Sequence, residues 1–593
     1  MTYNSEIRRQ LAQVALGNLE PDLVITHAQL VNVHTKEIEP DVSVAVKSGF
    51  IAYIGKSVPS IKDTTKVIDA HQQYLVPGLI DGHMHVESSM LSVAEFARAV
   101  LPFGTTTIFM DPHEMANVFG LEGVALMMHE AEHLPLRVFT TVPSCVPAAP
   151  GLEDSGQYLG PNEVHSALNF PRVAGLSEVM DFPGVVNGNP EVLEKIRLTY
   201  EKHQVVTGHL PTADDRIIQA YAATGIFSDH ESTSREEALA KARRGITVMI
   251  REGTAWKDVH ECIKIVTEDG IDPHQCLLVT DDVEPATLVQ DGHLNVVVRR
   301  AIEEGVDALS AIQMATINTA RYFHVEDWLG SIAPGHVADM LLMPDLLNMR
   351  PSVVFAGGEI VAENGQLIAE ITAPSYPDYV KKSVHLPRAV TAQDFFVKSE
   401  SCSQGEVTVR AIGVNNNSAL THVYTSTARV EEGVILPSPD NDLVYAAVLE
   451  RHHGSGQIGR GFVHGFGIQR GAVASTVGHD SHNLMVMGVN PTDMAMAANA
   501  LAQCGGGMVA VLDQTILALV SLPIAGLMAE ESAQVMAEKL ERLTEAWRRL
   551  GCTLHAPYMT FSLIALPVIP ELRLSNRGLV DVMSMTLVPV EVF

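Results

Sequence analysis

Eight short apolar runs, spaced roughly 20 to 40 residues apart, most constrain what this chain can fold into. They lie between Leu75 and Arg321 and read VPGLIDGHMH, GTTTIFMDPHE, PLRVFTTV, PRVAGLSE, QVVTGH, GIFSDHE, GITVMIRE and QCLLVTDD. Each run has the length and composition of a buried strand, and helical stretches separate them. Eight such alternations in about 245 residues are typical of a (β/α)8 barrel. We therefore predict an α/β fold with a TIM-like barrel over residues 76–325.

The segments on either side of these runs are also predicted to form strands. DLVITHAQLVNV and VSVAVKSGFIAYIG precede the barrel and have alternating or β-branched patterns. SVVFAGGEIVAENGQ follows it, with Gly357-Gly358 as a hairpin signal. We expect residues 22–75 and 326–380 to pair into one small β-sandwich domain that flanks the barrel.

The two ends of the chain have different patterns. Ile7, Leu11 and Val14 at helical spacing predict a short amphipathic helix within residues 1–21. Residues 381–593 are predicted to form a C-terminal α+β domain, with a helix near 530–550. In this domain GHDSHN holds two imidazoles and a carboxylate within five residues, at 479–483. We expect this segment to reach the mouth of the barrel and to help exclude water from it.

Composition limits the partners and the compartment. Asp+Glu is 70 against a Lys+Arg count of 40, which gives a net charge of −30. Such a surface repels phosphate backbones and anionic lipid, so we expect neither nucleic acid nor a membrane as a partner. The 6 cysteines form no CxxC pair, and the N-terminal residues lack the apolar stretch of a secretory signal, which predicts a cytoplasmic protein. For a chain of this size we expect a homodimer, although no motif identifies the interface.

Potential metal ligands stand at the ends of several predicted strands. His83 and His85 end the first run, and since a strand alternates its faces, both imidazoles point the same way. The ends of parallel barrel strands meet on one face. Four further candidates stand at the ends of other runs, namely Glu178, His209, His230 and Asp281. Imidazole and carboxylate without thiolate suit Zn, Fe or Mn, and these six ligands together suit a site for two ions.

Longer motifs resemble a known family. PGLIDGHMHVESSM, DPHEMANV, SDHE and TDD resemble the metal-dependent amidohydrolase superfamily and, within it, the bacterial adenine deaminases. GHDSHN and LPVIPELR are similar to the C-terminal domain of adenine deaminases, so the resemblance covers nearly the whole chain. It implies the conversion of adenine to hypoxanthine and ammonia in purine salvage, through a metal-activated hydroxide that attacks C6. It further implies two divalent ions, Mn²⁺ or Fe²⁺, with Zn²⁺ as an alternative, and a preference for adenine over adenosine.

The resemblance also implies roles for particular residues. Many amidohydrolases bridge their two metals with a carboxylated lysine at the end of the fourth strand. This sequence has no lysine between Lys66 and Lys195, so Glu178 is implied as the bridge. Asp281 is preferred to Asp282 as a ligand because it directly follows the apolar strand CLLVT. The proton shuttle is expected to be Asp281 or, as the second candidate, Glu87.

Several other residues near the predicted site have alternative roles. Asp111, His113 and Glu114 in DPHE either form a turn capped by Asp111 or make a wall of the purine pocket. Arg251 either hydrogen-bonds a purine nitrogen or pairs with a carboxylate. Ser88 either contacts the substrate or caps the following helix.

Two rival functions are considered. Another amidohydrolase acting on a cyclic amide or a related purine would share the fold, but the missing lysine counts against the cyclic-amide enzymes. A non-enzymatic scaffold on this fold should have lost metal ligands, whereas all six positions are filled here.

Overall fold

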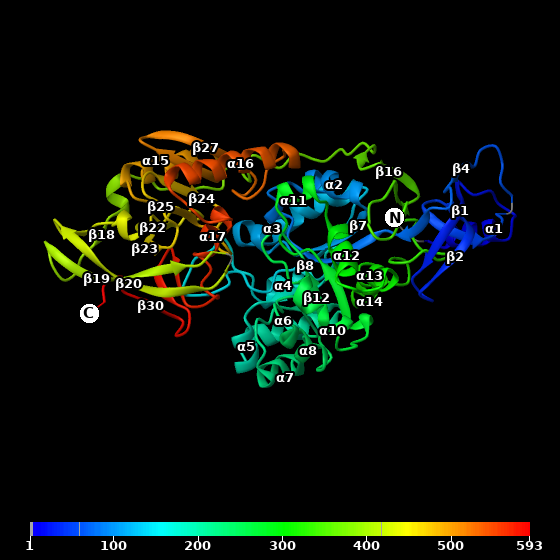
Figure 1. Cartoon of the computed structure of the whole chain (residues 1–593), viewed down its shortest axis with the longest axis horizontal. Coiled ribbons are helices and arrows are strands. Elements are labelled where there is room, and N and C mark those ends of the chain that lie inside the picture. The colour runs from blue at the N-terminus through cyan, green and yellow to red at the C-terminus, as the bar shows by residue number, and fades with distance from the viewer. Residues whose placement is uncertain (1–3, 59, 417, 593) are drawn as a thin grey trace.

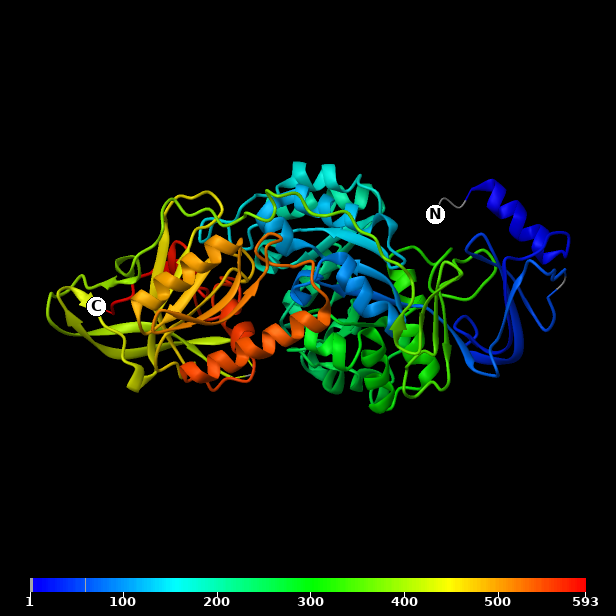
Figure 2. The ribbon, with the colours of Figure 1, turned by 90° about the horizontal axis from the view of Figure 1, so that it is seen from above.

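The computed structural model describes residues 4–58, 60–416 and 418–592. Figure 1 shows an elongated molecule in which N-terminal strands occupy one end, parallel strands with their helices the middle, and the C-terminal residues the other end. Figure 2 shows the same order from above, with helix α1 (Ser5–Ala15) lying at the outer end. The Asn4 side chain caps α1 by accepting a hydrogen bond from the Ile7 amide. The first three residues of the predicted helix lie outside the described residues.

Strands from both sides of the central region share one sheet, in the order β17-β16-β15-β14-β5-β1-β2-β3, with β4 beside β1. Strand β5 joins the two halves because it pairs with β1 in parallel and with β14 in antiparallel register. The flanking strands therefore form one continuous sheet, whereas a sandwich was expected, and β5 extends two residues past the expected boundary at 75. The strands are β1 (Leu23–Asn32), β2 (Glu37–Lys47), β3 (Phe50–Gly55), β4 (Lys66–Asp69), β5 (Tyr74–Pro77), β14 (Met340–Met343), β15 (Val353–Ala356), β16 (Glu359–Glu363) and β17 (Gln366–Leu367).

Each of the eight apolar runs contains one strand, and all their ladders are parallel. They are ordered β10-β9-β8-β7-β6 in one sheet and β11-β12-β13 in another. A parallel bridge between Met84 and Asp281 links the end of β6 to the residues after β13, where the Asp281 amide donates to the His83 carbonyl at 3.1 Å. The strands are β6 (Leu79–Met84), β7 (Thr105–Met110), β8 (Arg137–Val142), β9 (Val173–Val179), β10 (Val205–Gly208), β11 (Ser228–Asp229), β12 (Thr247–Arg251) and β13 (Cys276–Val279).

Helices between these strands cover the parallel sheets, which is why strands such as β7 and β13 are buried along their whole length instead of alternating. In Figure 1 they lie around the strands, from α2 and α3 in blue to the later helices in cyan and green. The principal helices are α2 (Val93–Val100), α3 (His113–Glu130), α6 (Pro190–Glu201), α7 (Asp215–Ala223), α8 (Arg235–Ala242), α11 (Pro285–Gln290), α12 (Leu294–Glu303) and α13 (Ala308–Met314).

The C-terminal residues form a second large sheet, in the order β18-β21-β20-β19-β23-β22-β25-β24-β26-β27. Helix α15 (Pro491–Cys504) packs on this sheet, and α16 (Ala533–Leu550) coincides with the helix predicted near 530–550. No helix among the described residues combines the length and the apolar character needed to cross a bilayer. The strands of this sheet are β18 (Val397–Lys398), β19 (Gly405–Val414), β20 (Thr421–Glu431), β21 (Val434–Ile435), β22 (Leu443–Leu449), β23 (Ile458–His464), β24 (Ala472–Ser475), β25 (Leu484–Gly488), β26 (Gly507–Leu512) and β27 (Thr515–Ser521).

The C-terminal region is fixed directly to the parallel-strand region. The Ala529 amide donates to the Met90 carbonyl, and the Ser92 amide donates to the Ala529 carbonyl, both at 3.0 Å. Arg577 forms an ion pair of 2.6 Å with Asp154. These contacts hold the C-terminal residues against the loops that follow β6 and β8.

Candidate metal centre and active site

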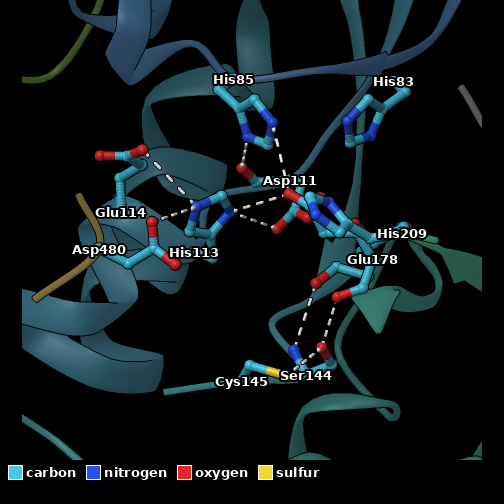
Figure 3. A network of polar contacts seen from close by, with 12 residues as sticks. His83, His85, Asp111, His113, Glu114, Ser144, Cys145, Glu178, His209 and Asp480 are labelled. Atoms are coloured by element: carbon cyan, nitrogen blue, oxygen red, sulfur yellow. Dashed lines mark hydrogen bonds and ion pairs between the residues drawn. The ribbon is translucent and has the colours of Figure 1, made fainter. Parts of the chain in front are cut away.

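The six predicted ligands gather at the carboxyl ends of the parallel strands. His83 lies in β6 and Glu178 in β9, while the other four directly follow β6, β10, β11 and β13. All of them are buried except His209, whose side chain is 18% exposed. The strand order brings side chains that are distant in sequence to one point, as Figure 3 shows for His83, His85, Glu178 and His209.

Glu178 lies at the centre of this cluster. Its Oε2 atom is 2.7 Å from His209 Nδ1 and 3.1 Å from His230 Nε2. Its Oε1 atom is 3.5 Å from both His85 Nε2 and His113 Nδ1. Burial alone would raise the pKa of Glu178, but the hydrogen bonds from His209 and His230 hold it well below its ordinary value. The carboxylate therefore stays charged and faces imidazoles on two sides.

Asp281 is a second carboxylate beside His83 and His85. Its Oδ1 atom is 3.4 Å from His85 Nε2 and 3.8 Å from His83 Nε2. The other oxygen accepts a hydrogen bond of 2.7 Å from Arg251. Burial would raise the pKa of Asp281, but the Arg251 guanidinium lowers it well below its ordinary range. The structure thus brings Asp281 to the cluster, while Asp282 accepts a hydrogen bond from Ser88.

The donor atoms of this cluster fit divalent cations. Several groups of described residues hold ligand atoms that all lie within 4.8 Å of one another, among them His83 with Glu178 and His230, His83 with His85 and Asp281, His85 with Asp111, His113 and Glu178, and His209 with His230 and Glu231. His83 Nε2 and both carboxylate oxygens of Asp111 are buried without a hydrogen-bond partner. Buried polar atoms are normally paired, so these atoms indicate a bound cation or ligand. His85 Nδ1 faces the Asp111 carbonyl at 3.0 Å, which directs its Nε2 atom into the cluster.

Arg251 ends β12 and lies among carboxylates. Besides Asp281 it contacts Asp258 at 2.8 Å and also pairs with Glu231. Of the two roles considered for Arg251, the observed contacts are those of the ion pair. Glu231 was not predicted as part of the site, although its Oε1 atom is 3.5 Å from His230 Nε2. Its place directly after His230 in SDHE was the one signal for it in the sequence.

Glu87 and Ser88 follow His85 in a short 3-10 helix, Glu87–Ser89. Ser88 does not cap the next helix, because the Ser92 side chain accepts the capping hydrogen bond from the Glu95 amide. Glu87 accepts a hydrogen bond of 3.1 Å from the Met115 amide through Oε1, while its Oε2 atom has no partner. Burial and the nearby Glu114 carboxylate raise the pKa of Glu87 to about 7.

The predicted HDSHN segment reaches the site from the C-terminal region. Asp480 Oδ1 is 3.8 Å from His113 Nε2, and His479 Nδ1 is 2.6 Å from Glu114 Oε1. His482 contacts the other oxygen of Glu114. Figure 3 shows Glu114 and Asp480 on the same side of His113, both facing its Nε2 atom, with Asp480 on a ribbon from the C-terminal part of the chain. His113 and Glu114 therefore connect the metal-ligand cluster to the C-terminal region.

The contacts of His482 define the group that Glu114 forms with the two C-terminal histidines. The Gly478 amide donates to His482 Nδ1 at 3.2 Å. That nitrogen must therefore offer its lone pair, and the proton of the neutral ring lies on Nε2, the atom that contacts Glu114. Burial lowers the pKa of His482 to about 4, in keeping with the neutral ring. Glu114, His479 and His482 nevertheless offer ligand atoms within 4.8 Å of one another, and His482 Nε2 is buried without a well-formed hydrogen bond.

Comparison with known proteins gives the family. An amidohydrolase family model matches residues 74–361, and a model described as the adenine deaminase C-terminal domain matches residues 418–586. The adenine deaminase of Moorella thermoacetica is 49% identical over 585 residues, covering 98% of each chain. This chain belongs to the adenine deaminase family. Adenine deaminase 3 of Rhizobium meliloti is 47% identical over 581 residues, with 98% of this chain and 97% of the relative covered. An adenine deaminase of Clostridium botulinum is 44% identical over 577 residues, with 97% of this chain and 96% of the relative covered.

Proposed function

We propose that this chain hydrolyses adenine to hypoxanthine and ammonia at the cluster of strand-end ligands, with two divalent metal ions. Membership of the adenine deaminase family supports the substrate and the reaction. The main support for this site is the cluster of buried imidazoles and carboxylates around Glu178. The ligands would be His83, His85, Glu178, His209, His230 and Asp281, with Glu178 contacting both ions.

Divalent cations held there would supply an activated water for attack on C6 of the purine. The donor set of imidazole and carboxylate suits Mn²⁺, Fe²⁺ or Zn²⁺. The chain's own contribution is to orient the ligands: Arg251 fixes Asp281, and the Asp111 carbonyl fixes His85. Such supporting contacts typically change metal affinity or activity by about 10- to 100-fold when they are removed.

Proton transfer is assigned to Glu87 and Asp281. Ammonia leaves only after protonation, so a side chain must deliver a proton to the purine and to its amino group. A pKa of about 7 lets Glu87 exchange a proton near neutral pH, and its Oε2 atom has no other partner. Asp281 is held ionised by Arg251 and is therefore suited to accept a proton rather than to donate one.

Substrate contacts are assigned to His113, Glu114 and Ser88. Glu114 is buried and held by His479 and His482, so its carboxylate is fixed in place for an N–H of the purine. His113 lies between Glu114 and Glu178. Arg251, first considered for this role, has its contacts with carboxylates instead, and we assign it to positioning Asp281.

The parallel strands β6–β13 are assigned to one closed (β/α)8 barrel. The bridge between Met84 and Asp281 supports closure on one side. We retain the division into an N-terminal helix, a composite β domain, a barrel and a C-terminal α+β domain, with the first boundary of the barrel moved to follow Pro77.

An ammonia-release assay on adenine, with metal content measured on the same sample, tests the proposal. We expect turnover that is lost on chelation and regained on adding Mn²⁺ or Fe²⁺. Turnover of a cyclic amide but not of adenine would overturn the substrate assignment.

A further inference from the structure

Two side chains from helices outside the parallel strands reach the strand ends that hold Glu178, His209 and His230. These helices are α7 and α8, which contact each other in the lower part of Figure 1. Tyr221 lies in α7 and Lys241 in α8, and both side chains are fully buried. Neither residue is a ligand in the proposed site, so the reaction as described gives them no part.

Lys241 and Asp229 form a closed group of hydrogen bonds. The Lys241 ammonium donates to Asp229 Oδ2 at 2.7 Å, to the Leu210 carbonyl at 2.6 Å and to Ser232 Oγ at 3.0 Å. These three bonds use all the donors of the ammonium. Asp229 in turn accepts from the Leu210 amide at 2.7 Å and from the Ser232 hydroxyl at 3.0 Å. The ion pair therefore holds both the amide and the carbonyl of Leu210.

This group joins the chain segments that carry two of the ligands. Leu210 directly follows His209, and Asp229 directly precedes His230. The two imidazoles approach the same atom, Glu178 Oε2, at 2.7 and 3.1 Å. Because the ion pair holds Leu210 to Asp229, it fixes the distance between the backbones of the two histidines.

Tyr221 makes a similar link between the ends of β9 and β10. Its hydroxyl accepts a hydrogen bond of 3.0 Å from the His209 amide and donates one of 2.9 Å to the Val179 carbonyl. Val179 directly follows Glu178. The tyrosine therefore fixes the His209 backbone relative to that of Glu178, just as the ion pair fixes it relative to that of His230.

Stability of the fold is a weak reason for burying such a pair. The side chains of Lys241 and Asp229 are both 0% exposed, and a buried ion pair seldom stabilises a protein more than apolar side chains of similar volume would. Contacts that orient the ligands are, in contrast, a general feature of metal sites. Their loss typically lowers metal affinity or activity by about 10- to 100-fold.

We propose that Tyr221 and the Lys241–Asp229 pair are positioning residues, which hold the three ligands around Glu178 Oε2 in place for one of the two metal ions. The inference rests on the proposed function, because it requires the metal ions. The ligands at the ends of β6 and β13 have other supports, such as Arg251. The ion that they bind should therefore be affected less.

Two variants of the full-length protein, each with a matched control, test this proposal. Tyr221→Phe removes the linking hydroxyl, and its control is Tyr445→Phe, because Tyr445 is a buried tyrosine that donates to a backbone carbonyl in the C-terminal sheet. Lys241→Met removes the cation, and its control is Arg137→Met, because Arg137 pairs with Asp339 at the amino end of β8, away from the ligands. Each protein is freed of metal by chelation and titrated with Mn²⁺, and electron paramagnetic resonance measures the free ion. Urea titrations measure the stability of the same metal-free proteins.

Lys241→Met should weaken the binding of one Mn²⁺ ion by about tenfold or more and Tyr221→Phe by about fivefold, whereas the controls should change neither ion's affinity by more than about twofold. Tyr221→Phe and Tyr445→Phe should lose similar stability in urea, so that loss of stability does not account for the loss of metal. If Lys241→Met does not fold, the comparison of the two tyrosine variants decides.

Unchanged Mn²⁺ affinity in both test variants, or an equal loss in their controls, would overturn the positioning role. Two bound ions and adenine turnover in the parent enzyme would then leave the proposed function standing. Selective loss of one ion in the variants, with a parent enzyme that binds two ions and does not deaminate adenine, would overturn the proposed reaction alone. Fewer than two bound Mn²⁺ ions in the parent enzyme would overturn both.

Discussion

The substitution Glu178→Gln should remove metal and activity together. Glu178 contacts four imidazoles at distances between 2.7 and 3.5 Å, and an amide of the same size removes the negative charge that these contacts share. Loss of a group that merely supports a ligand costs about 10- to 100-fold in metal affinity or activity. The loss of a ligand that contacts both ions should reduce metal affinity and activity further. We therefore expect kcat to fall at least 100-fold, equivalent to about 2.7 kcal/mol of barrier.

The assay combines elemental analysis with ammonia release from adenine on one preparation. Glu130→Gln is the matched control, because Glu130 is a buried carboxylate bonded to the Val93 and Ala94 amides and has no histidine partner among its hydrogen bonds. That variant should lose some stability and keep its metal. If Glu178→Gln retained two metal ions per chain and full turnover, the assignment of Glu178 as the bridge would be wrong.

Three further predictions concern the support of the site and its selectivity. Arg251→Gln leaves the buried Asp281 and the partly buried Glu231 without their cation, so the free energy of unfolding of the metal-free protein should fall by about 3 kcal/mol in urea titrations; no change would contradict the ion-pair role. His482→Leu should lower kcat/KM for adenine about tenfold, because Glu114 loses one of its two C-terminal histidine partners, whereas His482→Gln, which keeps an N–H donor, should recover most of it; equal effects would indicate a merely structural role. Adenosine should be deaminated at less than about 1% of the kcat/KM for adenine, a difference of about 2.7 kcal/mol, and comparable values would refute the expected preference for adenine.

Most of the parallel-strand region was predictable because local sequence determines it. Strands that are buried on both faces read as continuous apolar runs, and the eight runs each contain a strand. Even β11, which is only two residues long, was marked by the residues Ser228 and Asp229 ahead of His230. The single flanking sheet was harder to predict, since it depends on β5 pairing with strands on both sides of the central region.

The ligand cluster was predictable for a topological reason. Parallel strands end at the same edge, so ligands at successive strand ends converge although they are up to about 200 residues apart in sequence. HxH at His83 and His85 was informative because side chains two apart on a strand share a face. Asp111 and Glu231 carried weaker signals, since a carboxylate after a strand more often forms a cap or a turn.

Contacts between the parallel-strand region and the C-terminal region could be predicted only in outline. The polarity of HDSHN indicated that the segment approaches the site, but its partners are more than 300 residues away. Which side chains meet there depends on how the two regions dock, through contacts such as Ala529 with Met90. Local patterns contain no information on that docking, and so the pairing of Glu114 with His479 and His482 had to come from the structure.

The proposed function requires a dinuclear metal site that deaminates adenine. The most direct test is the metal content per chain, measured together with adenine deamination, before and after chelation and after adding back Mn²⁺ or Fe²⁺. The proposed site predicts about two ions per chain, loss of activity in proportion to metal removed, and recovery on adding metal. Full deamination by a chain that holds no metal, or two bound ions with no turnover of adenine, would contradict it.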